Sequence, residues 1–246
     1  MCAWKYSQLK TTRFSILLFF FLLANSLKAE ELQMSISYLG LDVVNVVLTD
    51  DGRILKVTAK ATFLASIAAG MDNSYIAEYV DDYLPVRRNK TIIQKDYEEN
   101  RTILYDRDND LAVRTSHLSS DRSKTYPIYK DTRDFFTALF YIRTHLDTPK
   151  RLYLDANGLI WSADYTIVGI EKINSVLGKV DAIKVEVDFK KISPENKERS
   201  DMLTNNLVNE SKKLVLWFSS DSRHLPLKTR YQRKPFPVYW LLQSYE

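Results

Sequence analysis

Residues 180–190, VDAIKVEVDFK, alternate apolar and charged side chains with a period of two. The apolar members are Ile183, Val185, Val187 and Phe189, and the charged ones between them are Lys184, Glu186 and Asp188. Such alternation is typical of a β-strand that packs one face against a core and exposes the other face to water. The stretch therefore predicts an antiparallel sheet with one wet face.

The same pattern recurs along most of the chain. Residues 53–67 alternate in this way, and we expect them to pair with 34–49 as a long hairpin across the Asp-Asp-Gly turn at 50–52. The Asn-Gly pair at 157–158 is the strongest short hairpin signal. The other strand-like runs are 91–99, 101–110, 111–116, 151–170, 180–190, 213–221, 227–232 and 237–245. So many strands suit a curled sheet, sandwich or barrel better than a flat sheet, and the predicted fold class is all-β, mainly antiparallel.

Residues 131–145, DTRDFFTALFYIRTH, break the strand pattern. Asp131 is placed to cap a first helical turn, with Asp134 three residues later, while Arg143 and His145 suit the C-terminal end. The expected helix is apolar nearly all round, and a helix of that kind is buried. We expect it to lie against the concave face of a curved sheet, either as core or beside a hydrophobic binding groove.

A groove at this helix would be lined by aromatic and apolar side chains. The candidate groove or helix-lid residues are Phe135, Phe136, Leu139, Phe140, Arg143, Trp161 and Trp217. Arg143 would contact an anionic group of a ligand, and its alternative role is an internal ion pair with Asp134, Asp221 or another acid. For the two tryptophans the alternative role is core packing.

A polar stretch separates two of the later strands. Residues 193–212, SPENKERSDMLTNNLVNESK, contain few β-branched side chains. They predict a surface loop with a short helix around 201–206.

The N-terminal residues 1–29 have the layout of a secretory signal peptide. Lys5, Lys10 and Arg13 precede an apolar run at 14–24. That run is shorter than the roughly 20 residues that a bilayer-spanning helix needs. We expect export by a cleavable signal peptide and no stable membrane span after cleavage.

Two cleavage points fit this signal, after Ser26 or after Ala29, and the pattern does not choose between them. The only cysteine, Cys2, precedes the apolar run, so the sequence does not indicate a lipid anchor. Residues 30–246 are long enough to bury one substantial core and are predicted to form a single exported β-rich domain.

The charge balance bears on possible partners. The whole chain has 35 basic and 31 acidic residues, and residues 1–29 contain four of the basic ones and no acid, which leaves 31 of each sign. A mature chain without net charge argues against nucleic acid as a partner, because phosphate backbones are met by clustered Lys and Arg. Arg87, Arg88 and Lys90 lie close together, and we interpret them as a solvated strand face.

No sequence motif indicates a reaction or a cofactor. The six glycines form neither a phosphate-binding loop nor a nucleophile elbow. His117, His145 and His224 are far apart, so we expect no metal site. Residues 106–110 space their carboxylates like a calcium loop, but Leu111 replaces the required glycine, which favours a hairpin turn. We expect no catalytic residue, metal or cofactor.

Three stretches in order carry a family resemblance: Asp134 with FFTALFYIRT after it, then residues 168–187, then residues 214–231. The matching positions are Asp134, Arg143, Gly178, Trp217, Asp221 and Pro226. Together they resemble the exported bacterial proteins of domain of unknown function 3108 over most of the mature chain, with a looser match at 66–86. The resemblance implies a periplasmic β-rich domain, a large curved sheet or half-open barrel similar to lipoprotein-carrier half-barrels. It supplies no catalytic residues.

Three hypotheses for function follow. The first is a non-catalytic periplasmic protein that binds or carries a hydrophobic or amphiphilic envelope component, such as a lipid, in an apolar groove. The second is an envelope scaffold that takes a partner protein at its sheet edges. The third is an enzyme acting on cell-wall or polysaccharide material, for which the sequence shows no paired carboxylates. A concave apolar cavity would favour the first, an unpaired edge the second, and titratable groups around a cleft the third.

Overall fold

The computed structural model describes residues 29–68, 70–147, 150–156 and 158–246. Nearly all of the predicted signal peptide, residues 1–28, lies outside the described residues, as does Asn157 of the predicted hairpin turn. No helix in the described ranges is both long and apolar enough to cross a membrane.

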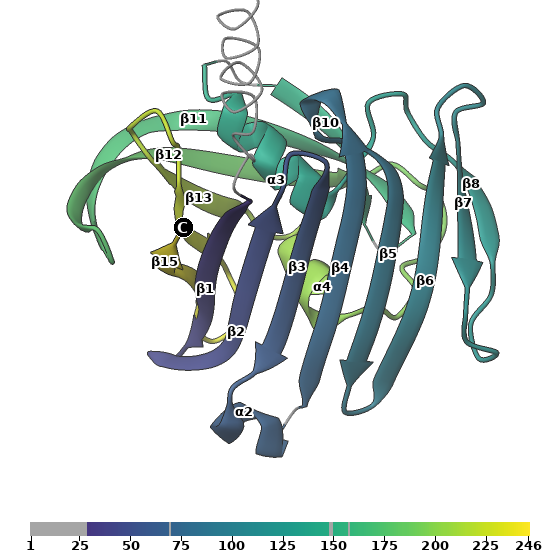
Figure 1. Ribbon diagram of the computed structural model, residues 1–246, viewed down its shortest axis with the longest axis horizontal. Coiled ribbons are helices and arrows are strands. Elements are labelled where there is room, and N and C mark those ends of the chain that lie inside the picture. The colour runs from purple at the N-terminus through teal and green to yellow at the C-terminus, as the bar shows by residue number, and fades with distance from the viewer. Residues whose placement is uncertain (1–28, 69, 148–149, 157) are drawn as a thin grey trace, which may run out of the picture.

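Within the described ranges, fifteen strands form one curved sheet (Figure 1). The strands are β1 (Glu30–Tyr38), β2 (Leu41–Asp50), β3 (Ile54–Ala61), β4 (Met71–Val80), β5 (Leu84–Gln94), β6 (Tyr97–Asp106), β7 (Leu111–Ser116), β8 (Lys124–Pro127), β9 (Arg133–Asp134), β10 (Lys150–Ala156), β11 (Leu159–Ser175), β12 (Gly178–Lys191), β13 (Leu214–Ser219), β14 (Pro226–Tyr231) and β15 (Val238–Tyr245). All neighbours are antiparallel except β9 and β10. The first strand pairs with the last, so β8 and β9 are the two edges.

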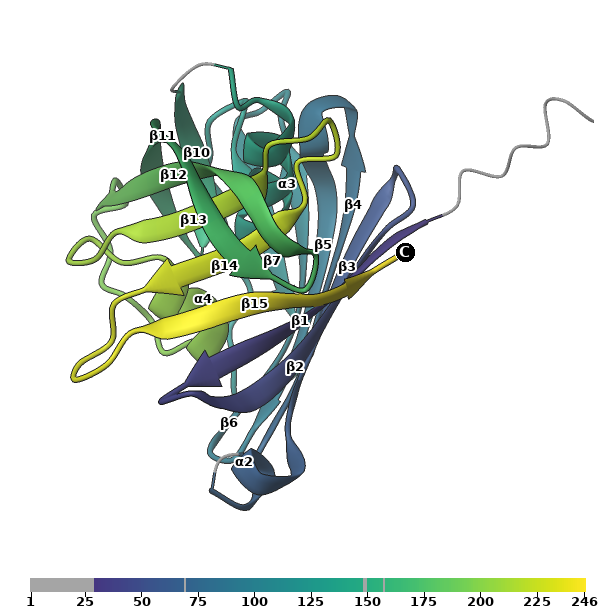
Figure 2. The ribbon, with the colours of Figure 1, turned by 90° about the vertical axis from the view of Figure 1, so that its left-hand side faces the viewer.

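The sheet curls into a half-barrel that is not closed by hydrogen bonds (Figure 2). Within the described residues, no strand pairing joins the edge strands β8 and β9. The predicted fold class, a large and mainly antiparallel curved sheet with a buried helix, is confirmed.

The buried helix, α3 (Phe135–Thr144), lies on the concave side of the sheet at one end of the half-barrel (Figure 1). Eight of its ten residues are buried. Asp134, and not Asp131, caps it, because residues 133–134 are still extended and pair with β10. The Asp134 carboxylate accepts hydrogen bonds from the backbone N–H groups of Phe136 at 2.9 Å and Thr137 at 3.4 Å.

The predicted long hairpin of 34–49 with 53–67 is wrong at its outer ends. A turn at Leu39 and Gly40, both with positive φ, divides the first run into β1 and β2. The second run leaves the sheet after β3 and forms the short helix α2 (Phe63–Ala68), where the strict alternation gives way to the good helix formers Leu and Ala. Between these ends, β2 and β3 pair across the predicted turn.

Two short helical segments complete the fold. A 3₁₀ turn, η1 (Asp81–Tyr83), precedes β5, and α4 (Met202–Leu207) confirms the predicted short helix. The description of this region as a surface loop is wrong for Asp201, which caps α4 and is fully buried. The buried charge of Asp201 is compensated by an ion pair with Lys90.

Candidate ligand-binding cavity

The four predicted groove residues Phe135, Phe136, Leu139 and Phe140 are all buried on α3. The rings of Phe136 and Phe140 pack against Tyr75 and Tyr83 respectively, at centroid distances of 5.0 and 5.7 Å. Between α3 and strands β10 to β13 a space of only about 10 Å³ is left. Because this space is much smaller than a ligand pocket, a groove at these residues stays a prediction that would require α3 to move.

Arg143 ends α3 as an internal ion-pair partner. Its guanidinium donates two hydrogen bonds, of 2.6 and 2.7 Å, to the two carboxylate oxygens of Glu30. It also donates to the backbone carbonyl of Arg223, at 2.7 and 3.0 Å. In the structure Arg143 therefore has its alternative role, an ion pair with another acid, which is Glu30.

The two predicted tryptophans lie apart. Trp161 is buried in β11, and its indole N–H donates to the carbonyl of Ala156 at 3.2 Å. Trp217 lies between Leu216 and Phe218 in β13, where Leu214 and Leu216 face α3. By strand alternation Trp217 therefore points to the opposite, convex face of the sheet. There it lies beneath the Lys228 ammonium at 5.0 Å, and the structure does not bring it to the helix.

The larger cavity lies at the opposite end of the half-barrel from α3, beside α4 and α2. It encloses about 290 Å³, close to the lower limit of typical ligand pockets, which is about 300 Å³. Its wall is almost entirely apolar and includes Ile36, Val44, Ala65, Met71, Leu203 and Val238. No sequence motif marks it, because its wall comes from six strands, from the segment after β14 and from both α2 and α4.

Strand register explains why these side chains meet. Ile36 of β1 pairs with Val44 of β2, and Tyr38 pairs with Val238 of β15, so the inward positions of three adjacent strands align. Leu203, from the first turn of α4, packs across them and is buried. A concave apolar wall results at the point where the two halves of the chain meet.

Arg233 supplies the charge at this cavity. Its guanidinium lies 5.8 Å from the ring centroid of Tyr38, and both residues line the cavity. In the described part of the chain, Arg233 forms no ion pair with a carboxylate. An unpaired guanidinium beside an apolar cavity suits a carboxylate or phosphate group of a bound amphiphile.

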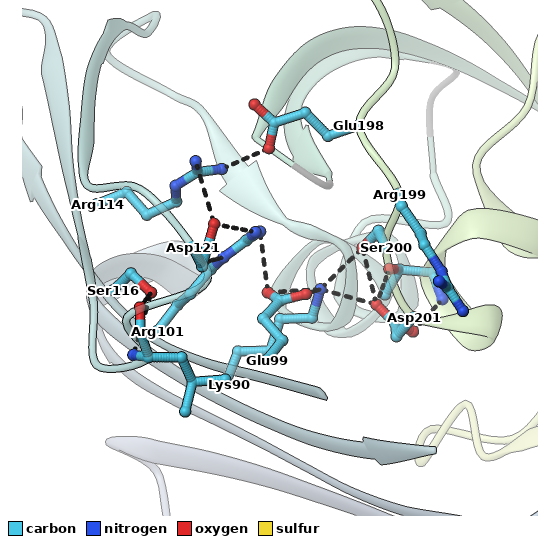
Figure 3. A network of polar contacts seen from close by, with 12 residues as sticks. Lys90, Glu99, Arg101, Arg114, Ser116, Asp121, Glu198, Arg199, Ser200 and Asp201 are labelled. Carbon is cyan, nitrogen blue, oxygen red and sulfur yellow. Dashed lines mark hydrogen bonds and ion pairs between the residues drawn. The ribbon is translucent and has the colours of Figure 1, made fainter. Parts of the chain in front are cut away.

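A buried charge network fixes α4 next to the cavity (Figure 3). The Lys90 ammonium of β5 lies 2.8 Å from Asp201 and 3.1 Å from Glu99, and it donates to the Ser200 hydroxyl at 3.1 Å. Arg101 of β6 lies 3.2 Å from Glu99. Two cations and two carboxylates thus balance one another away from water, which is the arrangement that buried charges require.

The network continues to the loop before α4. Arg101 donates to Asp121, and Arg114 of β7 donates to Glu198 at 2.9 Å (Figure 3). Burial alone would raise the pKa of Asp121, but hydrogen bonds from Arg101 and Ser116 lower it. Arg114 thus holds Glu198 against β7, and Lys90 holds Ser200 and Asp201 against β5.

A second buried cluster bridges the two parts of the open sheet. Arg88 of β5 lies 3.4 Å from the Asp155 carboxylate of β10 and donates to its backbone carbonyl at 3.0 Å. Tyr105 and Tyr126 donate to the same carboxylate at 3.0 and 2.7 Å. Burial, followed by the charge of Asp155, raises the pKa of Tyr126 and keeps its hydroxyl protonated as a donor. Side chains therefore connect β5 to β10, which no backbone pairing joins within the described residues.

The interpretation of Arg87, Arg88 and Lys90 as a solvated strand face is wrong for two of the three. Arg88 and Lys90 point inward and are buried, and only Arg87 is exposed. They share the phase of the buried Ile92, but the exposed Ile93 stands in the opposite phase, so alternation alone does not show which face of β5 is buried. The space beside them is about 10 Å³, so in this conformation they hold protein segments together.

The family described as protein of unknown function DUF3108 matches residues 33–235. The chain belongs to this family. The predicted resemblance is thereby confirmed. No curated protein matches the sequence.

By fold, several solved structures are similar to this chain. A β-barrel-like protein of domain of unknown function 1849 from Brucella abortus superposes with a TM-score of 0.57 at 7% identity, covering 89% of this chain and 98% of that chain. This likeness shows the fold alone. The hypothetical lipoprotein YmcC from Escherichia coli gives a TM-score of 0.35 at 11% identity, covering 98% of each chain. A protein from Bacteroides fragilis, described as exported and YmcC-like in fold, gives 0.31 at 11% identity, covering 88% of this chain and 95% of that chain.

Proposed function

We propose that this DUF3108 protein binds or carries a hydrophobic or amphiphilic component of the bacterial envelope, in the periplasm and without catalysis. The apolar part of the ligand occupies the cavity between β1, β2, α2 and α4. The observation that carries the proposal is the apolar cavity of about 290 Å³ beside Arg233, which forms no ion pair with a carboxylate among the described residues. Burial of an alkyl chain in such a wall is favourable by about 0.8 kcal/mol per CH₂ group.

The polarity of the wall sets the expected orientation. Ile36, Val44 and Leu203 offer no hydrogen-bonding side chain, so this part of the cavity suits an alkyl or isoprenoid chain. Arg233 lines the cavity as its single charged side chain among the described residues. An anionic headgroup would therefore lie against Arg233 while the chain points inward.

This site differs from the predicted groove beside α3. A ligand at Phe136 or Phe140 would have to displace rings that are already packed, whereas the cavity beside α4 needs no such opening. The groove at Phe135, Phe136, Leu139 and Phe140 remains the alternative location for the same function.

Two other functions find less support. Strand addition needs an accessible sheet edge, and the edges offer four residues in β8, the last of them Pro127, and two in β9. An enzyme needs convergent titratable groups at a cleft, and the buried ionisable groups are instead engaged with one another.

The test is the binding of a fluorescent fatty acid to the purified mature protein in the absence of membranes. Ala65→Phe, which adds a ring at a position that lines the cavity, is expected to weaken binding at least about tenfold. Ser66→Phe is the matched control, because Ser66 is the exposed neighbour on the same helix and does not line the cavity.

Each result assigns the site. Unchanged binding by Ala65→Phe would reject the cavity, and Phe136→Asp would then test the groove at α3. A wild-type protein that binds neither the fatty acid nor any molecule in an envelope lipid extract, as judged by native mass spectrometry, would reject the carrier function.

A further inference from the structure

We propose that the rim of this cavity is a docking surface for a phospholipid bilayer that contains anionic lipid. The rim consists of the β1–β2 turn (39–41), helix α2 (Phe63–Ala68) and the β14–β15 turn (232–237). The proposal rests on the proposed function in one respect: a docked rim would place the cavity mouth against the lipid from which a ligand enters.

Helix α2 presents its large apolar side chains to solvent. Phe63, Leu64 and Ile67 are 81%, 76% and 74% exposed, whereas the small Ala65 lines the cavity. A helix on a soluble domain normally turns its large apolar residues towards the core. The reversed arrangement of α2 indicates a surface that an apolar partner covers when the protein functions.

The two turns of the rim repeat this arrangement. Leu39 and Leu41 are exposed in the β1–β2 turn, and Phe236 is exposed in the β14–β15 turn. Tyr38, which precedes Leu39, and Val238, two residues after Phe236, line the cavity. Both turns and α2 project at the same side of the half-barrel, the lower side of Figure 2. The apolar surface outside is therefore continuous with the apolar wall inside.

The charge of the rim indicates which apolar partner fits. Its three segments contain Arg233 and Lys234 and no acidic residue. Neither forms an ion pair with a carboxylate in the described ranges. Basic side chains beside exposed aromatic and aliphatic ones are the composition of surfaces that insert into the interface of anionic membranes.

The shape of the rim favours a bilayer over a folded protein. The exposed side chains stand on three separate projections around an opening, and a fluid surface can accommodate each projection without matching its shape. A protein partner would instead require a complementary surface with a packed centre. We therefore commit to the bilayer as the partner.

The experiment is flotation of the purified mature protein with vesicles of phosphatidylethanolamine and phosphatidylglycerol. The wild type is expected to float with the vesicles, and less with vesicles of phosphatidylcholine alone. The triple variant Phe63→Ser, Leu64→Ser, Ile67→Ser is expected to bind at least about tenfold more weakly. The matched control carries Val168→Ser, Ile170→Ser and Val176→Ser on the exposed β11–β12 hairpin, away from the rim, and is expected to bind as the wild type does.

Three results would overturn the proposal. They are a wild type that does not float with any of these vesicles, equal binding by the wild type and the α2 variant, and equal losses in both triple variants. In the first case, a protein rather than a bilayer would be the expected partner of the rim. Fatty-acid binding without vesicles is measured on the same preparations. A protein that floats but binds neither the fatty acid nor any molecule in an envelope lipid extract would keep the docking surface and reject the carrier function.

Discussion

The two helices on the concave side of the sheet, α3 and α4, are both capped by a buried aspartate but are held in different ways. At α3, Asp134 accepts hydrogen bonds from Phe136 and Thr137 of its own helix, and eight of the ten residues of the helix are buried. At α4, Asp201 reaches Lys90 of β5 at 2.8 Å and Tyr75 of β4 at 2.7 Å. Apolar packing dominates at α3, where the ion pair of Arg143 with Glu30 is partly exposed, whereas α4 is also held by a buried ion pair.

This difference explains why the cavity lies at one end. Non-directional apolar packing leaves no free space, and only about 10 Å³ remains beside α3. A directional contact at Asp201 positions α4 without filling the space beyond it, where about 290 Å³ stays open. We infer that buried charge is what allows a helix to border a cavity here.

The largest expected effect tests the packing of α3. Phe140 is 1% exposed, and Phe140→Ala is expected to lower the free energy of unfolding by about 3–5 kcal/mol because it removes buried contacts and leaves a cavity. Urea denaturation measures it. Phe236→Ala, at the exposed rim, is the control and is expected to change the free energy by about 0.5 kcal/mol or less. A loss at Phe140 no larger than the control would mean that packing does not hold α3.

The second prediction compares the two caps. In Asp134→Asn the amide oxygen still accepts the backbone hydrogen bonds and the amide N–H donates to the Thr137 hydroxyl, so the expected cost is about 1 kcal/mol or less. In Asp201→Asn an uncharged amide replaces the partner of Lys90, and the cost is about 3 kcal/mol or more because a buried ammonium loses a charge partner. Urea unfolding at neutral pH gives both values. Equal costs would contradict the distinction between the helices.

The third prediction is that the effect of Asp201→Asn on stability depends on pH. Burial alone would raise the pKa of Asp201, but the charge of Lys90 and the hydrogen bonds from Lys90, Thr204 and Tyr75 lower it to about 2. A lowered pKa stabilises the fold at pH values above the unfolded pKa, about 4, and this contribution is lost as the pH falls towards 2. The difference in unfolding free energy between wild type and Asp201→Asn is therefore expected to be constant above about pH 5 and to shrink below pH 4. A difference that stays constant down to pH 2 would remove the ion pair as the cause.

The strands and the buried helix were easier to predict from the sequence than the side-chain contacts between them. Alternation located most strands, and the apolar composition of 131–145 predicted a buried helix, because both signals are local. Arg88 and Lys90 could not be placed, because β5 carries Ile92 in their phase and the exposed Ile93 in the other. Their partners are also far along the chain: Arg88 donates to the carbonyl of Asp155, 67 positions away, and Lys90 donates to Ser200, 110 positions away.

The cavity could not be predicted from the sequence for a related reason. Phe63 continues the apolar phase of 53–67, which predicts a buried strand residue, yet the chain leaves the sheet before it and Phe63 becomes the most exposed large apolar side chain of the described residues. Alternation cannot show where a strand ends when the next residues remain apolar. Which positions line a cavity depends on register between strands from both ends of the chain, and a single sequence does not contain that register.

The smallest expected effect concerns the one charge on α3. Arg143→Gln removes a two-fold hydrogen-bonded pair with Glu30, but both side chains are partly exposed, so the expected loss is about 1 kcal/mol and smaller in about 1 M salt. Urea unfolding at low and high salt measures it. Arg151→Gln, which breaks the more exposed pair with Asp164, is the control and is expected to have almost no effect. A loss at Arg143 as large as that of Asp201→Asn would show that charge holds α3 as well. The cavity would then need another explanation than the way its neighbouring helix is fixed.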